Sequence, residues 1–115
     1  MDKRIIWNKP TTYDNPFVEF LSNNNTIIIY NQEELNEFIL LLASVGLEIK
    51  NKKEHNYNYF IELMRINNQE YKGYVIFEYD NYKGLTFWND IDESESWYGK
   101  KPYALKDLNY AIKEE

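Results

Sequence analysis

The 115-residue sequence contains no cysteine and only one histidine, His55. The absence of cysteine excludes disulfide bridges, thiolate nucleophiles and every cysteine-ligated metal site. A single histidine also excludes the ordinary structural zinc sites, which need several nitrogen or sulfur ligands. His55 follows Lys52-Lys53-Glu54 in what reads as a solvated polar loop, whereas a catalytic histidine needs an orienting carboxylate. The sequence therefore predicts no catalytic residue, and the protein is expected not to be an enzyme.

Glycine and long apolar runs are equally scarce. The four glycines are isolated from one another, so no loop is available to cradle a phosphate. The longest apolar stretch runs from Phe38 to Val45 and is interrupted by Ser44, far short of the roughly 18 to 20 residues that span a bilayer. The first residues lack the apolar region of a secretion signal. We therefore expect a cytoplasmic protein that does not contact membranes.

Acidic residues outnumber basic ones by nineteen to thirteen, which gives a formal charge of −6. The imbalance is uneven, because residues 1–53 carry a charge of about −1 and residues 54–115 about −5. Such a surface repels phosphate, so direct binding of nucleic acid is not expected. Two interpretations remain open. The charge either serves solubility alone or forms an acidic face that meets a basic groove on a partner protein.

The apolar pattern predicts a single α+β domain over residues 1–115. A helix is predicted from Gln32 to Val45, with Asn31 as its N-cap and Gly46 as its C-cap. Its apolar side chains recur at helical spacing at Leu35, Phe38, Ile39, Leu42 and Val45. The run Thr26–Tyr30 indicates a buried strand before this helix, and residues 47–50 indicate another after it.

The second half of the chain shows alternation typical of strands. Alternating side chains predict strands at Tyr57–Ile66, Gly73–Tyr79 and Leu85–Trp88. The ends of the chain suggest a strand over Arg4–Trp7, a short helix opened by Asn15-Pro16-Phe17, and a short helix through Leu105, Leu108 and Ile112. We therefore predict an antiparallel β-meander of three to five strands packed against one main α-helix, with a short C-terminal helix.

Acids and large aromatic rings alternate between Phe87 and Tyr98. Trp and Tyr anchor interfaces because they bury a large area at low rotamer cost, and acids nearby would steer a basic partner. The predicted partner-binding residues are Trp88, Asp90, Asp92, Glu93, Glu95, Trp97 and Tyr98. The alternative is that Trp88 and Trp97 belong to the core while the acids cover a solvated loop.

The same acids raise the question of a metal site. Asp90, Asp92 and Ser94 match the first three alternate positions of a calcium-binding loop. The match then fails, because Glu95 stands where the turn needs glycine and Lys101 where a bidentate Glu is required. We predict no metal and no cofactor. A carboxylate-based metal-binding protein or hydrolase stays open as an alternative.

The Asn-, Tyr-, Ile- and Glu-rich composition, the strand–helix unit at residues 26–35 and the C-terminal run at residues 103–108 carry a resemblance. In these features the chain resembles the small acidic proteins of phages and mobile elements in low-GC Gram-positive bacteria, which include anti-CRISPR proteins. The resemblance implies a non-enzymatic inhibitor that imitates nucleic acid in the bacterial host cytoplasm. Its partner would be a protein with a basic groove, such as a CRISPR effector or another nuclease. An immunity protein that neutralises a toxin is the alternative, and a homodimer is a further expectation.

Overall fold

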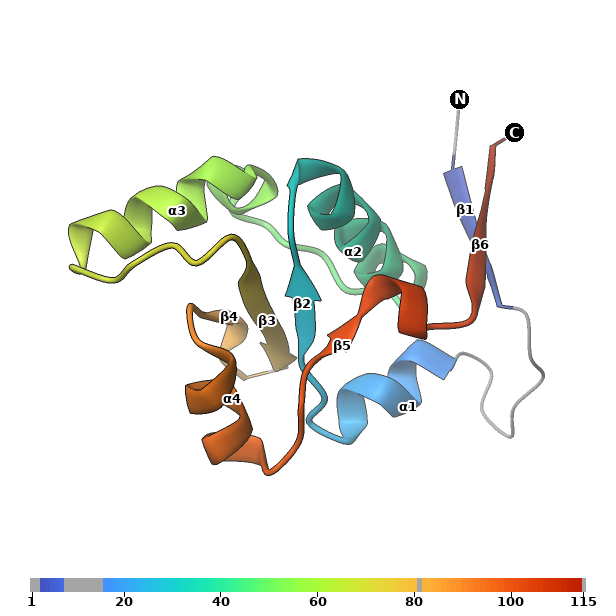
Figure 1. The fold of residues 1–115 in the computed structure, drawn as a ribbon. Helices are drawn as coiled ribbons and strands as arrows, with labels where there is room; N and C mark the ends of the chain where they lie inside the picture. Colours follow the sequence, from blue (N-terminus) through green and yellow to red (C-terminus); the bar gives the residue numbers. More distant parts are fainter. Residues whose placement is uncertain (1–2, 8–15, 81, 115) are drawn as a thin grey trace.

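The structure is a computed structural model that describes residues 3–7, 16–80 and 82–114, apart from the side chains at positions 16 and 96–98. It has an α+β fold, as the sequence predicts (Figure 1). In chain order its elements are β1 Lys3–Trp7, α1 Pro16–Ser22, β2 Ile27–Ile29, α2 Gln32–Ser44, η1 Lys52–His55, α3 Tyr57–Ile66, β3 Val75–Asp80, β4 Gly84–Trp88, α4 Ile91–Tyr98, β5 Tyr103–Ala104, η2 Leu105–Asp107 and β6 Tyr110–Glu114.

The described strands form two sheets. The larger one has the order β4-β3-β2-β5, with β2 antiparallel to β3, β3 antiparallel to β4, and β2 parallel to the short β5. The smaller one is a two-stranded antiparallel ribbon of β1 and β6, which register Ile5 opposite Ile112. In Figure 1 this ribbon stands beside α2, away from the larger sheet. The packing of a sheet against a main helix is therefore confirmed.

The main core lies between one face of the larger sheet and the helices α2 and α3. Alternate strand residues point to the same face, so Ile27 and Ile29 of β2 join Val75 and Phe77 of β3. The Phe77 ring centroid lies 5.8 Å from that of Phe38 in α2 and 4.8 Å from that of Phe60 in α3. Burying side chains of this size stabilises the fold by about 1.5–3 kcal/mol each.

The opposite face of the larger sheet carries a second, smaller buried set. Ile28 of β2 lies opposite Ile76 of β3, and both are buried. Ser94 of α4 is also buried, and α4 contacts β4 directly. The larger sheet is thus covered on both faces, by α2 and α3 on one side and by α4 on the other.

Most of the local predictions are confirmed. Helix α2 begins after its N-cap Asn31, whose side-chain oxygen accepts a hydrogen bond from the Glu34 amide at 2.9 Å. It ends at Ser44, with Val45 rather than the predicted Gly46 as its C-cap, and Gly46 follows with a φ of 79° that glycine adopts without strain. The strands predicted around residues 27–29, 75–79 and 85–88 are present, as are a strand near the N-terminus and a short helix after residue 15.

The strand predicted over Tyr57–Ile66 is wrong, because this segment is helix α3. Its buried residues, Tyr57, Phe60 and Met64, are spaced at three and four, which is the helical period. The Asn56 side chain caps the helix by accepting from the Asn58 amide at 3.0 Å. As a result β2 pairs with β3 across two intervening helices, and only β3 and β4 are joined by a short turn.

Two smaller predictions also differ from the structure. Residues 47–50 form no strand, although Ile49 is buried. The C-terminal helix shrinks to the single 3-10 turn η2, after which the chain extends as β6. The reason is that Tyr110–Glu114 pairs along its whole length with β1, a long-range partner that helical spacing cannot reveal.

Candidate functional site at helix α4

The acidic segment, which the alternative interpretation placed in a solvated loop, forms helix α4. Asp90 is its N-cap, and Oδ1 of this residue accepts a hydrogen bond from the Asp92 amide at 2.9 Å. The other carboxylate oxygen, Oδ2, receives a charge-assisted hydrogen bond from Lys72 Nζ at 2.8 Å. The Lys72 bond, followed by the Asp92 amide, holds the pKa of Asp90 below its usual value. The helix ends at Gly99, which has a φ of 67°.

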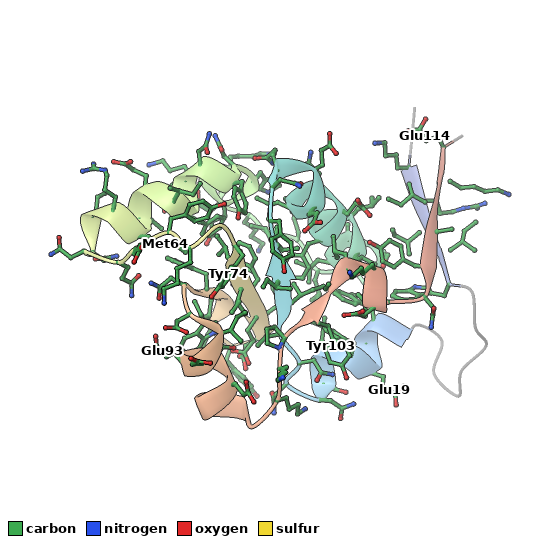
Figure 2. All side chains as sticks on the ribbon, in the orientation of Figure 1. Glu19, Met64, Tyr74, Glu93, Tyr103 and Glu114 are labelled. Atoms are coloured by element: carbon green, nitrogen blue, oxygen red, sulfur yellow. The ribbon has the colours of Figure 1, made fainter. Side chains whose placement is uncertain are left out.

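Helix geometry separates the α4 side chains into an inner and an outer set. Successive residues turn by about 100°, so residues three and four apart share a face. Ser94 is 0% exposed and faces the sheet, while Ile91 and Glu95 are half-buried. Asp92 and Glu93 are exposed, and Figure 2 shows Glu93 at the outer edge of the molecule. Two of the predicted acids, Asp92 and Glu93, are therefore exposed on the first turn of α4.

These outer acids are not neutralised by neighbouring bases. Within residues 3–7, 16–80 and 82–114, Asp90 is the only acid of this segment that forms an ion pair. Asp92, Glu93 and Glu95 form none with a described residue. Because these carboxylates project from one short, capped helix, α4 presents a concentrated negative potential.

The aromatic residues of the predicted site are placed differently. Trp88 lies in β4 opposite Ile76 and is half-buried, so it belongs partly to the packing beneath α4. The side chains of Trp97 and Tyr98 lie outside the described part of the structure. The prediction for these two residues therefore remains a prediction.

Two tyrosines that the sequence did not single out lie beside the start of α4. Tyr74 Oη accepts a hydrogen bond from the Ile91 amide at 3.3 Å. The Tyr30 and Tyr74 rings meet edge to face, with centroids 6.5 Å apart, and Tyr30 is 48% exposed. Tyr30 follows β2 and Tyr74 precedes β3, so only the strand pairing brings them together. The α4 surface, defined here as Asp92, Glu93, Glu95, Tyr30 and Tyr74, combines negative charge with exposed ring area.

Other chemically capable residues serve the fold. His55 is half-buried, and its Nε2 lies 2.6 Å from the Ile49 carbonyl oxygen, which can only accept a hydrogen bond. The predicted solvated setting of His55 is therefore wrong. Asp80 Oδ1 accepts from the amides of Tyr82 and Lys83, which fixes the turn before β4. Across the described residues, no group of three or more His, Cys, Asp or Glu side chains is placed to hold a metal ion.

The described part of the chain also forms open grooves. One open groove of about 370 Å³ lies between α1, the end of α2 and the β3–β4 turn. Its lining mixes apolar and polar side chains, and its one carboxylate is Asp80, which already accepts hydrogen bonds within its own turn. Among the residues that the structure describes, no helix has the length and apolar character needed to cross a membrane.

Comparisons with protein-family models, with curated proteins and with solved structures yield no match to this chain. The functional argument therefore rests on the geometry of the α4 surface.

Proposed function

We propose that this chain is a non-enzymatic binding protein that docks through the α4 surface onto a basic region of a partner protein. The observation that carries the proposal is the exposed pair Asp92 and Glu93, which form no ion pair with a described residue, on a helix capped at both ends. Unpaired surface acids raise association rates with a basic partner and suppress acidic ones.

Rigidity adds to the electrostatic argument. Asp90 caps α4, and Lys72, in the segment before β3, donates a hydrogen bond to the Asp90 carboxylate. The Tyr74 hydroxyl accepts a hydrogen bond from the Ile91 amide at the start of the helix. The carboxylates are therefore held in place before the partner arrives, which lowers the ordering cost of binding. Tyr30 adds an amphipathic ring of low rotamer entropy beside them.

The partner that best fits this chemistry is a protein whose basic groove binds nucleic acid. Carboxylates on successive helical positions would occupy the place of phosphates, and Tyr30 would offer a ring where a base otherwise stacks. Occupation of the groove would exclude nucleic acid, so the chain would act as an inhibitor. Together with the resemblance to phage proteins, this points to nucleases of bacterial defence, including CRISPR effectors, as the first partners to test.

The test uses a panel of purified bacterial defence nucleases, with binding and inhibition of DNA or RNA cleavage measured at low and high salt. The variant Asp92→Asn/Glu93→Gln removes two charges from α4, and Glu33→Gln/Glu48→Gln removes two exposed charges elsewhere. We expect the α4 variant to weaken binding by about tenfold or more and to reduce its dependence on salt. The control pair should leave affinity nearly unchanged.

Equal losses in both variants would contradict the proposal, because only the net charge would then matter. Tight binding that is insensitive to both salt and the α4 variant would contradict it as well. A panel in which the wild-type chain binds no nuclease at any salt would rule out the proposed class of partner.

A further inference from the structure

The groove between α1, the end of α2 and the β3–β4 turn joins segments that lie far apart in the sequence. Its volume of about 370 Å³ lies near the lower end of the roughly 300–1,000 Å³ that small-molecule sites enclose. The apolar part of its lining comes from α1 and from the segment after α2, as Val18, Leu21, Val45 and Leu47. The groove therefore has the size and the mixed lining that suit a small ligand.

The apolar lining is partly open to solvent. Val18 is 47% exposed, and Leu21, Val45 and Leu47 are half-buried. At the rim, Tyr82 is 99% exposed, an unusual position for a large ring. A ligand with an apolar body would remove this surface from water, which is favourable. Burial of apolar surface attracts many ligands, however, and does not select among them.

A single charge in the groove supplies the selection. Asp80 is the only charged side chain among the described residues that line it. Its Oδ1 atom accepts hydrogen bonds from the amides of Tyr82 at 2.6 Å and Lys83 at 3.1 Å. Oδ2 bonds to no described residue, and Asp80 forms no ion pair with one. The two amides hold the pKa of Asp80 below its usual value, so this carboxylate is charged at neutral pH.

Two basic residues lie near the groove but do not line it. Lys83 also lowers the Asp80 pKa, but it is the smallest of the causes and forms no ion pair with this carboxylate. Lys100 is bonded to the Asn23 carbonyl and the Asn25 side chain. The described lining therefore keeps its negative charge. The formal charge of −6 on the whole chain also favours a cation over an anion.

We propose that this groove binds a small organic cation, an amine whose ammonium group pairs with Oδ2 of Asp80 and whose apolar body lies against Val18 and Leu47. The exposed Tyr82 ring follows Asp80 closely in the chain and is available to cover the ammonium group by a cation–π contact. The carboxylate repels an anion, and a neutral ligand gives it no opposite charge. The groove shares no residue with the α4 surface, so the inference does not depend on the proposed nuclease partner.

An NMR titration of the labelled full chain with three probes, at constant ionic strength, tests the inference. The probe 2-phenylethylammonium carries both charge and an apolar ring, 2-phenylethanol carries the ring alone, and methylammonium carries the charge alone. Because the groove is open, we expect a Kd on the order of millimolar for the first probe. It should bind about tenfold more tightly than the alcohol, and methylammonium should not saturate.

The position of the shifted signals is part of the result. The amides of Val18, Leu21, Leu47 and Asp80 should move together with one binding curve. Equal affinities for 2-phenylethylammonium and 2-phenylethanol would overturn the inference. Saturable shifts that lie away from this groove, or no saturation by the ammonium probe, would overturn it as well.

A variant of Asp80 separates its charge from its role in the turn. Asp80→Asn keeps an acceptor oxygen for the two amides but removes the charge. It should lower the affinity for the ammonium probe to that for the alcohol and leave the alcohol unchanged. The control Glu48→Gln removes a charge from an exposed side chain next to Leu47 that does not line the groove, and it should keep the tenfold preference. Equal losses in the two variants would show that only net charge matters, against the inference.

Substitution of Val18 gives a second test that leaves the turn intact. Val18 is exposed, so a polar replacement there costs little stability. Val18→Lys brings an ammonium group of the chain itself into the groove and should abolish binding of the probe. Val18→Gln, which is neutral, should bind it more weakly than wild type but measurably. Circular dichroism establishes that the variants are folded. Equal affinities of these two variants would contradict the proposal, and this pair decides if Asp80→Asn does not fold.

Discussion

Lys72 Nζ lies 2.8 Å from Oδ2 of Asp90, and this ion pair joins the segment before β3 to the cap of α4. The hydrogen bond from Lys72 is the largest cause of the lowered Asp90 pKa. In Lys72→Gln we therefore expect the Asp90 pKa to rise toward its usual value, while the remaining bond from the Asp92 amide keeps it somewhat below. The loss of stability should be small because the pair is partly exposed. A carboxyl-detected NMR titration measures the shift. An Asp90 pKa that does not move would show that the pair is absent in solution.

Asp80 gives a prediction about acid stability. The amides of Tyr82 and Lys83 donate to its carboxylate and lower its pKa. A folded pKa below the unfolded one contributes stability above the unfolded value, near 3.9, and this contribution is lost as pH falls through the folded pKa. Asn at this position keeps the acceptor oxygen but does not titrate. Asp80→Asn should therefore flatten the fall in stability at acid pH while changing stability at neutral pH little. Denaturant unfolding at a series of pH values checks this, and an unchanged acid profile would contradict it.

Ser94 is the residue at which removing a polar group should stabilise the protein. Its Oγ is buried and has no hydrogen-bond partner among the described residues. Burial without a partner is unfavourable for a hydroxyl, so Ser94→Ala should raise the free energy of unfolding by about 1 kcal/mol. The matched control is Ser44→Ala in α2, because Ser44 Oγ donates to the Leu41 carbonyl at 2.6 Å. Chemical denaturation compares the two. Destabilisation by Ser94→Ala would show that its hydroxyl has a partner in solution, such as a buried water.

The sequence predicts the elements whose signals are local. Asn31, Gly46 and the apolar spacing between them define α2, since cap and periodicity agree. Tyr57–Ile66 was misassigned because its residues satisfy the strand and the helical period at once. Its length of ten residues and the cap at Asn56 favour the helix. The C-terminal strand could not be predicted, because the partner that decides it, β1, lies more than a hundred residues away.

The candidate site shows the same division between local and long-range information. The acids at positions 90, 92, 93 and 95 were found because they are close in sequence, but Asp90 was not recognised as an N-cap. Had it been, α4 would have followed, with Asp92 and Glu93 in a favourable first turn. Tyr30 and Tyr74 could not be found, since only the pairing of β2 with β3 brings their rings together.

Tyr57 supports the last prediction, which concerns the joint between α3 and the larger sheet. Its hydroxyl donates to the Ile29 carbonyl at 3.0 Å and lies 2.9 Å from the Tyr71 hydroxyl. Tyr57→Phe leaves the buried carbonyl without this donor, so the free energy of unfolding should fall by about 1 kcal/mol. The control Tyr59→Phe changes the same helix at a half-buried ring with no hydroxyl partner among the described residues and should have little effect.

The titration of Tyr57 gives a second readout of the same joint. Burial, followed by the Tyr71 hydrogen bond, raises the pKa of Tyr57 well above its usual value of about 10. A raised folded pKa contributes stability that is fully present below the unfolded value and is lost as pH rises through the folded one. Wild-type stability should therefore fall more steeply above about pH 10 than that of Tyr57→Phe. Denaturant unfolding at alkaline pH measures both slopes. Parallel slopes, together with equal stabilities of Tyr57→Phe and Tyr59→Phe, would mean that this hydroxyl does not hold α3 to β2.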